Sequence, residues 1–401
     1  MRMIWGTPEY KRKIRFAMLW AVLVYAAIKA CASFGVLNEY WRIMIDQSLI
    51  VAIGSLGLSI IYGFAGQFSL GHAAFYGLGA YTAGVIGKTW GKGDPVWFAL
   101  AMVLGIVVPA LISVAVGFPI LRLRSDYLGI ATLGFGVIVK VFLNNSDRVF
   151  PALGGATGMT GVPQLARFDL IYWVFVGVVI FVRGLVTSTY GRAWVAIRED
   201  ELAADVMGIN TAKSKQLAFT VGCALAGLAG ALYAYRYPYL HPSSFDPMKS
   251  LDFLLVVVLG GLGSMSGTLV TSVFVVFLLE GLRMVLGQTF IDWRGVIYAL
   301  ILIVTILLRP QGLFAGKEAG LLVMRPELLR KSRRLAKTGQ LKSAEPRENI
   351  EEFAEAELLA EPKLLPQPEL VPQSELLAEP KLLPKPELLP QPERGKSHAT
   401  S

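Results

Sequence analysis

Long apolar runs alternate with short polar segments along about the first 310 residues of the chain. We expect membrane spans at residues 16–36, 43–63, 71–87, 96–118, 127–143, 170–187, 216–235, 251–263, 266–286 and 293–308. Most of these runs are long enough to cross a hydrocarbon core about 30 Å thick as helices. The run at 251–263 is too short to cross alone, so the alternative to ten spans is eight spans with two re-entrant segments. The pattern predicts an all-α fold, a polytopic transmembrane helix bundle of 8–10 spans, some of them broken or re-entrant.

Lys and Arg gather in the segments at one set of span ends. They lie between residues 11 and 15, at 119–126, at 188–215 and after Arg309. Cytoplasmic flanks of membrane proteins are enriched in these residues, so we expect both termini to face the cytoplasm. The first apolar run is longer than a signal-peptide core and lacks a small-residue cleavage site, so we expect it to be retained. Residues 1–15 are then a basic cytoplasmic N-terminus, and residues 16–315 form the transmembrane domain with a large cytoplasmic loop at 188–215.

The character of the chain changes after residue 315. Residues 317–347 hold nine Lys or Arg and three Asp or Glu, whereas residues 348–401 hold five and eleven. The second stretch repeats ELLAEPKLLPQPEL with one change after 18 residues, and proline every few residues prevents a continuous helix. We expect a basic juxtamembrane segment at 316–347 and a disordered Pro/Glu/Leu repeat tail at 348–401.

Composition favours a membrane protein over a soluble one. The chain is 54% hydrophobic and 17% charged, whereas soluble domains carry about 25% charged residues. Its formal net charge is +9, and basic loops that orient a membrane protein account for this charge better than nucleic-acid binding does. We therefore expect the lipid bilayer, and no nucleic acid, as a partner.

The sequence offers no pattern typical of a catalytic or metal site. Cys31 and Cys223 lie in apolar spans, and His72 has no second ligand at metal-binding spacing. Gly87-Lys88-Thr89 is close to a nucleotide-binding P-loop, but Thr82 stands where the first glycine is required. We expect no enzyme activity, no catalytic residue, no metal and no cofactor in this chain. The protein is then a channel, an ion-coupled carrier or the membrane part of an assembly that takes its energy from another subunit.

Two glycine-rich segments, residues 63–84 and 259–267, fall within the apolar region. Glycine, glutamine and serine at membrane depth are tolerated where the backbone lines a cavity or is buried in protein, as in the broken helices of transporters. The alternative is close helix packing through small residues, which Gly222, Ala226 and Gly230 at i+4 spacing also predict. If the segments line a pathway, its candidate residues are Gln67, Ser69, Gly71, Gly260, Gly261, Gly263 and Ser264.

Charged residues inside spans are functional candidates because charge is costly in lipid. Glu280 and Arg283 stand one helical turn apart and are placed to pair. A proton-coupled carrier requires an unpaired central acid, and the candidate, Asp46, lies near the external end of its span. The sequence therefore disfavours proton coupling.

One short acidic stretch, EDELAADVMGI at 199–209, stands out in the large basic loop. Leu202, Val206 and Ile209 form a narrow apolar stripe at helical spacing. Acidic residues at 199–201 favour a helix N-terminus, and Gly208 is placed to end the helix. A helix of about two and a half turns is marginal alone in water, so the stripe should pack on its own bundle or on another protein. Acidic residues disfavour packing on an anionic lipid surface.

The acidic stretch resembles a known loop. Glu201-x-Ala203-Ala204-x-x-x-Gly208 is similar to the EAA…G loop of ABC-importer permeases, where it forms the coupling helix docked on the ATPase, although the LP ending of many permeases is missing. Other segments occur in the order expected of the branched-chain amino-acid ABC permease family, LivM type: GFAGQFSLGHAAFYGLGAYTAG, LRLRSDYLGIATLGFG, GATGMTGVP, GRAWVAIREDELAADVMGI, VVVLGGLGSMSGTLVT and RPQGLF. The resemblance covers about residues 40 to 315, and the repeat tail has no counterpart in it.

The resemblance implies an importer of leucine, isoleucine and valine in a bacterial inner membrane. It implies as partners a LivH-like second permease, two cytoplasmic ABC ATPases that bind ATP and Mg²⁺, and a periplasmic or lipid-anchored amino-acid-binding protein. The coupling residues would be Glu201, Ala203, Ala204, Gly208 and Ile209. Small Ala203 and Ala204 would permit close approach, and Glu201 could pair with a basic residue of the ATPase.

Three alternatives remain open at this stage. A permease of the same family could carry urea, short-chain amides or other hydrophobic amino acids, because glycine-rich backbone does not specify the solute. An ion-coupled secondary carrier would work without any ATPase. A scaffold that acts through its tail would lose its function on truncation after Phe314.

Overall fold

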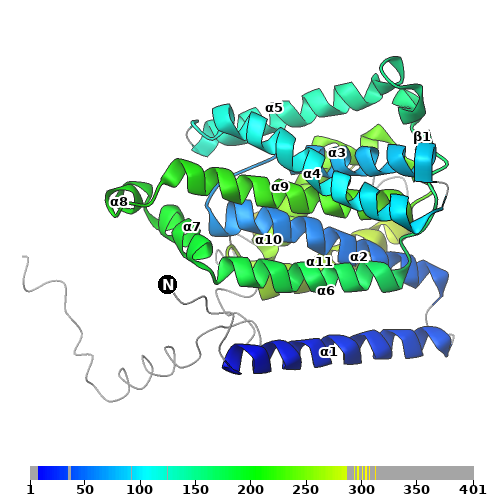
Figure 1. Ribbon diagram of the computed structural model, residues 1–401, viewed down its shortest axis with the longest axis horizontal. Helices are drawn as coiled ribbons and strands as arrows, with labels where there is room; N and C mark the ends of the chain where they lie inside the picture. Colours follow the sequence, from blue (N-terminus) through cyan, green and yellow to red (C-terminus); the bar gives the residue numbers. More distant parts are fainter. Residues whose placement is uncertain are drawn as a thin grey trace, which may run out of the picture. The chain divides into compact units, whose positions relative to one another are not determined.

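The computed structural model describes residues 8–34, 38–91, 93–123 and 125–286, together with the single residues 293, 296, 297, 300, 303, 304, 307 and 312. Helices account for most of them (Figure 1). The helices are α1 (Pro8–Ser33), α2 (Glu39–Leu58), α3 (His72–Ile86), α4 (Pro95–Ile120), α5 (Ser125–Asn144), α6 (Phe168–Val186), α7 (Thr189–Glu199), α8 (Glu201–Val206), α9 (Thr211–Arg236), α10 (Pro247–Gly260) and α11 (Met265–Leu286). Two π-helical segments, Ser59–Phe64 and Gly87–Gly91, continue α2 and α3.

Short irregular elements close the end of the bundle opposite α8. The 3-10 turns Ser146–Arg148, Pro151–Leu153 and Gly155–Thr157 lead into β1 (Met159–Thr160). This strand pairs antiparallel with β2 (Tyr239–Leu240), Met159 opposite Leu240. A further 3-10 turn, Pro242–Phe245, then leads into α10. We call this end the sheet end and the opposite one the α8 end.

The predicted helical bundle is confirmed, with differences at individual spans. Among the described residues, six helices are long and apolar enough to cross a membrane: Glu39–Phe64, Pro95–Ile120, Tyr127–Asn144, Phe168–Val186, Thr211–Arg236 and Met265–Met284. The first predicted span corresponds to α1, whose apolar part is Met18–Ser33. The predicted span 293–308 is described only at single residues, and the segments 316–347 and 348–401 lie outside the described residues.

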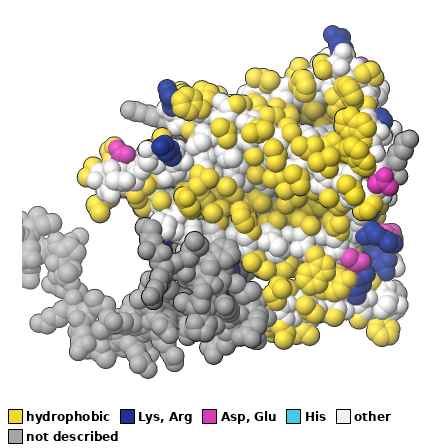
Figure 2. All heavy atoms as spheres, in the orientation of Figure 1, with side chains coloured by type: hydrophobic (Ala, Val, Ile, Leu, Met, Phe, Trp, Pro, Cys, Tyr) yellow, Lys and Arg dark blue, Asp and Glu magenta, His cyan; other side chains and the backbone are white. Residues whose placement is uncertain are grey.

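Helix α4 shows why the fold suits lipid. Its buried side is a row of small residues at i+4 spacing: Ala101, Gly105, Pro109, Ser113 and Gly117. Its opposite side exposes large apolar side chains, among them Val96, Leu111 and Phe118. Figure 2 shows hydrophobic side chains over much of the face on view. Small residues inside and large apolar residues outside are the pattern expected when lipid, not water, surrounds a helix pair.

Helix α9 packs almost backbone to backbone on α2 and α3. A Cβ on Gly79 would lie 2.2 Å from the Gly227 carbonyl oxygen, and one on Gly230 would lie 1.9 Å from the Tyr76 carbonyl oxygen. A Cβ on Gly222 would meet the Gly57 carbonyl oxygen at 2.6 Å. Close packing through the Gly222, Ala226 and Gly230 row is therefore confirmed, and part of the first glycine-rich segment serves the same purpose.

Two helices begin inside the bundle instead of at its ends. The backbone from Gly66 to Ser69 is non-helical, and α3 starts at His72. The N-terminus of α10 lies beside it, because the Ala73 amide donates to Ser250 Oγ at 2.9 Å. From this meeting point α3 runs to the sheet end, where Gly84 touches Leu240, and α10 runs to the α8 end. The chain then turns back into α11, and Thr271 Oγ1 donates to the Val256 carbonyl at 2.8 Å. The expected broken helices are α3, with 15 residues, and α10, with 14.

Candidate functional site

Side-chain caps define the loop that carries the acidic stretch. Ser188 Oγ accepts from the Tyr190 amide at the start of α7, Asp200 Oδ1 accepts from the Ala203 amide at the start of α8, and Asn210 Oδ1 accepts from the Lys213 amide at the start of α9. Each cap satisfies an amide that the first helical turn leaves free. Trp194 is fully buried, and its indole nitrogen donates to the Ser214 carbonyl at 2.9 Å. The loop is therefore anchored on α9.

Helix α8 is shorter than the sequence predicts. Glu199 ends α7, and Asp200 has extended backbone angles, φ −154° and ψ 112°, so only Glu201 of the three acids stands in the first turn of α8. The predicted end is confirmed, because Gly208 follows the helix with φ +84°. The early cap at Asp200 accounts for the difference, since an aspartate that accepts from the amide three residues ahead starts a helix instead of continuing one.

Most of the apolar stripe of α8 is uncovered in this chain. Leu202 and Val206 of the predicted stripe are 80% and 87% exposed, and Met207 beside them is 81% exposed. The third stripe residue, Ile209, is partly buried, and Ala204 is 4% exposed. Figure 1 shows α8 protruding at its end of the bundle. Ala204 therefore faces the chain's own bundle, and Ala203 lies on the exposed side. The sequence allows two packing partners for the stripe, its own bundle or another protein, and its own bundle leaves Leu202 and Val206 uncovered.

The charges around α8 hold the loop to the bundle. Glu201 forms an ion pair with Lys215 of α9. Arg198 pairs with Glu199 at 2.6 Å and also donates to the Gly63 carbonyl at 2.6 Å. The second of these bonds links α7 directly to the π-helical end of α2.

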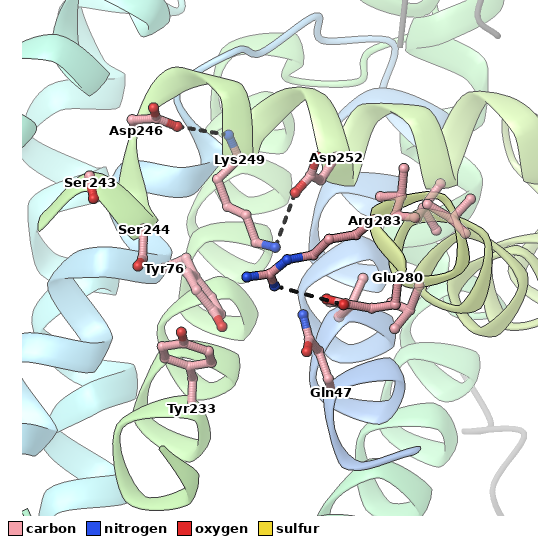
Figure 3. Close-up of a pocket in the computed structure, with 15 residues that line it drawn as sticks. Gln47, Tyr76, Tyr233, Ser243, Ser244, Asp246, Lys249, Asp252, Glu280 and Arg283 are labelled. Carbon is pink, nitrogen blue, oxygen red and sulfur yellow. Dashed lines mark hydrogen bonds and ion pairs between the residues drawn. The ribbon is translucent and has the colours of Figure 1, made fainter. Parts of the chain in front are cut away.

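A cavity of about 340 Å³, here called the Lys249 cavity, opens among α2, α3, α9, α10 and α11. Its polar residues are Gln47, Tyr76, Tyr233, Ser243, Ser244, Asp246, Lys249, Asp252, Glu280 and Arg283, and its apolar wall is Val51, Val256, Val275, Val276 and Leu279. Figure 3 shows the Lys249 ammonium and the Arg283 guanidinium turned into the space. Charges of both signs thus face one branched aliphatic wall.

Each charged residue that lines the Lys249 cavity has an ion-pair partner. Lys249 Nζ lies 3.1 Å from Asp252, Arg283 lies 3.8 Å from Glu280, and Lys140 lies 3.9 Å from Asp246. The predicted Glu280–Arg283 pair is confirmed. The separation between Arg283 and Glu280 is long for an ion pair, so a bound ligand with a charged group can compete for either residue at little cost.

Tyr237 orients the Gln47 amide, which lines this cavity. Burial raises the pKa of the Tyr237 phenol, which therefore stays protonated. Its hydroxyl lies 3.1 Å from Gln47 Oε1 and donates to it. The orientation of the Gln47 amide at the cavity wall is set by this bond.

A second cavity of about 460 Å³, here called the Gln67 cavity, lies at the α8 end. It is lined by Ala65, Gly66, Gln67, Leu121, Arg122, Leu123, Leu128, Ile197, Arg198, Glu201 and Lys215. The helix break before α3, the α4–α5 turn and the α7–α8 loop all contribute to its walls.

The structure places the predicted pathway residues in different surroundings. Gln67 lines the second cavity, and Ser69 is buried nearby in sequence with its hydroxyl unpartnered among the described residues. Gly71 packs on Thr132, since a Cβ there would lie 2.4 Å from the Thr132 carbonyl oxygen. None of these three lines the Lys249 cavity.

The second glycine-rich segment forms the tight turn between α10 and α11. Ser264 Oγ accepts from the Gly267 amide at 3.1 Å, and Gly260 approaches the Gly267 backbone. Gly261 and Gly263 adopt φ +104° and +79°. The turn lies against α2, because a Cβ on Gly63 would lie 2.9 Å from the Gly263 nitrogen. Gly260, Gly261, Gly263 and Ser264 therefore shape a turn at the α8 end.

The polar residues at the start of α10 were not predicted as functional from the sequence. The predicted span begins at 251, whereas α10 begins at Pro247, capped by Asp246. The sequence does contain a pattern that predicts this helix start: Asp246 is placed as an N-cap and Pro247 stands at the first helical position. Lys249 and Asp252 follow as two opposite charges one turn apart. Among the described residues, no group of three or more His, Cys, Asp or Glu converges as a metal-ligand set.

Comparison with protein-family models matches residues 42–306 to the family described as branched-chain amino acid transport system / permease component. The high-affinity branched-chain amino acid permease protein LivM of Salmonella typhimurium is 33% identical over 320 residues, which cover 71% of each chain. LivM of Escherichia coli is 30% identical over 69% of this chain and 72% of the relative. LivH of Salmonella typhimurium is 25% identical over 67% of this chain and 92% of the relative. No solved structure matches the chain.

Proposed function

The chain belongs to the family of branched-chain amino acid transport permeases, and from this premise we propose that it is the LivM-type permease subunit of an ATP-driven importer of leucine, isoleucine and valine. It pairs with a LivH-like permease, receives its solute from a binding protein and takes its energy from two ABC ATPases on the cytoplasmic side of a bacterial inner membrane. The α8 end then faces the cytoplasm, and the sheet end faces outward.

The exposed stripe of α8 carries the proposal of ATP coupling. Leu202, Val206 and Met207 form an apolar surface on a helix of six residues that projects from the bundle. Such a surface is costly in water and favours a protein partner. The connections of Arg198 to Gly63 and of Glu201 to Lys215 would pass motion of a docked ATPase to α2 and α9.

The Lys249 cavity fits the solute. A branched-chain amino acid carries a carboxylate, an ammonium group and a branched aliphatic side chain. Arg283 and Lys249 can receive the carboxylate, Glu280 the ammonium group, and Val256, Val275 and Leu279 the side chain. Urea would leave the aliphatic wall uncovered, so this cavity favours an amino acid over the same-family alternative of urea or amides.

The charge arrangement offers no support for an ion-coupled carrier. Asp46, the candidate unpaired acid, forms an ion pair with Arg236 at 2.6 Å. Asp46 is therefore not the unpaired acid that a proton-coupled carrier requires.

The assembled system in proteoliposomes tests the proposal. We expect leucine uptake that requires the binding protein, both permeases and internal ATP, and no uptake of urea. Uptake that persists without ATPases, driven by an imposed ion gradient, would instead establish a secondary carrier. Truncation after Phe314 separates the third alternative, since the transport proposal predicts that uptake largely survives.

Arg283→Gln tests the solute site. A hydrogen bond to a charged group contributes about 1.5–3 kcal/mol, so we expect the rate of leucine uptake at saturating loaded binding protein to fall about tenfold or more. Arg148→Gln, which changes an exposed arginine in the 3-10 turns of the sheet end, is the matched control. Equal rates in the two variants would exclude the Lys249 cavity as the solute site.

A further inference from the structure

The Gln67 cavity has the features of a ligand-binding site. Docking of an ATPase on α8 does not account for these features. Its walls come from the helix break before α3, the α4–α5 turn, α7, α8 and α9. These are the elements that a docked ATPase would move relative to one another. A molecule held here would touch the moving loop and the bundle together.

Gln67 is the first indication that the cavity can bind a polar molecule. The residue is 3% exposed, and neither its amide oxygen nor its amide nitrogen has a hydrogen-bond partner among the described residues. Leaving a buried amide without partners is costly. An amide that lines a cavity of about 460 Å³ is therefore placed to bind a polar group inside it.

The charges of the cavity indicate the chemistry of that group. Three cations, Arg122, Arg198 and Lys215, face one carboxylate, Glu201. Arg198 and Lys215 have ion-pair partners in Glu199 and Glu201. Within the described part of the chain, Arg122 makes no ion pair, and its guanidinium lies 4.3 Å from the centre of the Phe118 ring. Arg122 and Gln67 are thus available for a carboxylate, and Glu201 can receive an ammonium group.

The remaining wall is branched and aliphatic. Leu121, Leu123, Leu128 and Ile197 line it. The Lys249 cavity likewise combines cations, acids and a branched aliphatic wall, although its cations are paired. Two cavities in different parts of the bundle therefore fit the same class of molecule.

We propose that the Gln67 cavity binds the imported branched-chain amino acid from the cytoplasmic side and that this binding inhibits further import. The proposal rests on the proposed function, because it takes the solute and the orientation from it. The bound molecule bridges Gln67 and Arg122 of the bundle to Glu201 of α8. It binds best when these elements are close, so it stabilises that arrangement against the movement that transport requires. A high concentration of the amino acid inside the cell then slows its further uptake.

Proteoliposomes loaded with leucine test this inference. The readout is the ratio of ATP-driven uptake into empty vesicles to uptake into vesicles preloaded with unlabelled leucine, which is independent of each variant's basal rate. For the wild-type assembly we expect this ratio to rise with internal leucine. In Gln67→Leu and in Arg122→Gln, the internal concentration that halves uptake should rise about tenfold, as expected for a lost hydrogen bond or ion pair to a charged group.

Ser69→Ala is the matched control, because Ser69 is a buried polar residue of the same segment that does not line the cavity. It should keep the wild-type ratio. The inference would be overturned if internal leucine had no effect on wild-type uptake. It would also be overturned if the Gln67 and Arg122 variants were inhibited by internal leucine as strongly as the wild type. Neither result would contradict the import function. Inhibition by internal acetate as strong as that by leucine would also overturn the inference, because the site would then recognise any carboxylate. Absence of leucine uptake under all conditions would instead contradict the proposed function.

Discussion

Aspartate at both Leu202 and Val206 is expected to abolish ATP-driven leucine uptake and the recovery of ATPase subunits with the permease. Burying an exposed leucine or valine contributes about 1.5–3 kcal/mol each, and a carboxylate at an apolar interface adds a desolvation cost. The combined loss exceeds about 4 kcal/mol, which weakens binding about a thousandfold. Both side chains are more than three-quarters exposed within this chain, so the permease itself should fold and insert normally.

Asp205→Ala is the control for this experiment. Asp205 stands on α8 between the two apolar residues in sequence and is exposed, so its replacement leaves the stripe and the Asp200 cap intact. Uptake and ATPase recovery should remain within about twofold of wild type, as is usual for surface substitutions. Normal ATPase recovery by the double aspartate variant would show that another surface docks the motor. Loss of the inserted permease would show that the stripe packs within the membrane protein.

Helix α8 was predictable from the sequence only in part. The i+4 spacing of Leu202 and Val206 predicts an apolar stripe, and the positive φ of Gly208 follows from its place at the helix end. The start of α8 was not predictable from acidic content alone, because acids favour both an N-cap and a first turn. Only the hydrogen bond from the Ala203 amide to Asp200 distinguishes the two roles.

The bundle itself could be predicted from the apolar runs, but the cavities could not. Run length predicts eight to ten spans, because a helix needs about 20 apolar residues to cross the core, and six of them are found as candidate spans among the described residues. The meeting of α3 and α10 depends on one contact across the bundle, the Ala73 amide with Ser250 Oγ. Hydropathy does not report such contacts. As a result, Lys249 and Asp252 were not recognised as cavity residues, although Glu280 and Arg283 were singled out.

The glycine-rich segments allowed two interpretations, cavity lining and close helix packing, and the sequence alone could not decide between them. In the structure, the segment around Gly66 and Gln67 lines a cavity, whereas Gly79 packs on the Gly227 backbone. The difference lies in the neighbouring residues, since α9 places Gly227 and Gly230 against the α3 backbone at Gly79 and Tyr76. Both interpretations therefore apply, each to a different part of one segment.

Gly230→Ala is expected to prevent stable folding of the permease, although it is the smallest substitution available there. Alanine is favoured over glycine in a helix interior by about 1 kcal/mol, so propensity alone predicts a gain. The added Cβ would lie 1.9 Å from the Tyr76 carbonyl oxygen and 2.9 Å from the Ala80 amide nitrogen. These are backbone atoms that cannot rotate away, so α3 and α9 must separate along the contact. We expect a loss of more than about 3 kcal/mol, seen as little monodisperse protein in detergent and a melting temperature lowered by more than about 6 °C.

Gly177→Ala separates packing from propensity. Gly177 lies inside α6, and a Cβ there would have no heavy atom within 4 Å. Only the helix-propensity effect then operates, so the melting temperature should stay the same or rise by a few degrees. If both alanine variants shift the melting temperature alike, the α3–α9 contact is looser than its glycines indicate. If only Gly230→Ala destabilises, backbone contact between these helices holds the bundle together, because lipid removes the hydrophobic drive that would otherwise join them.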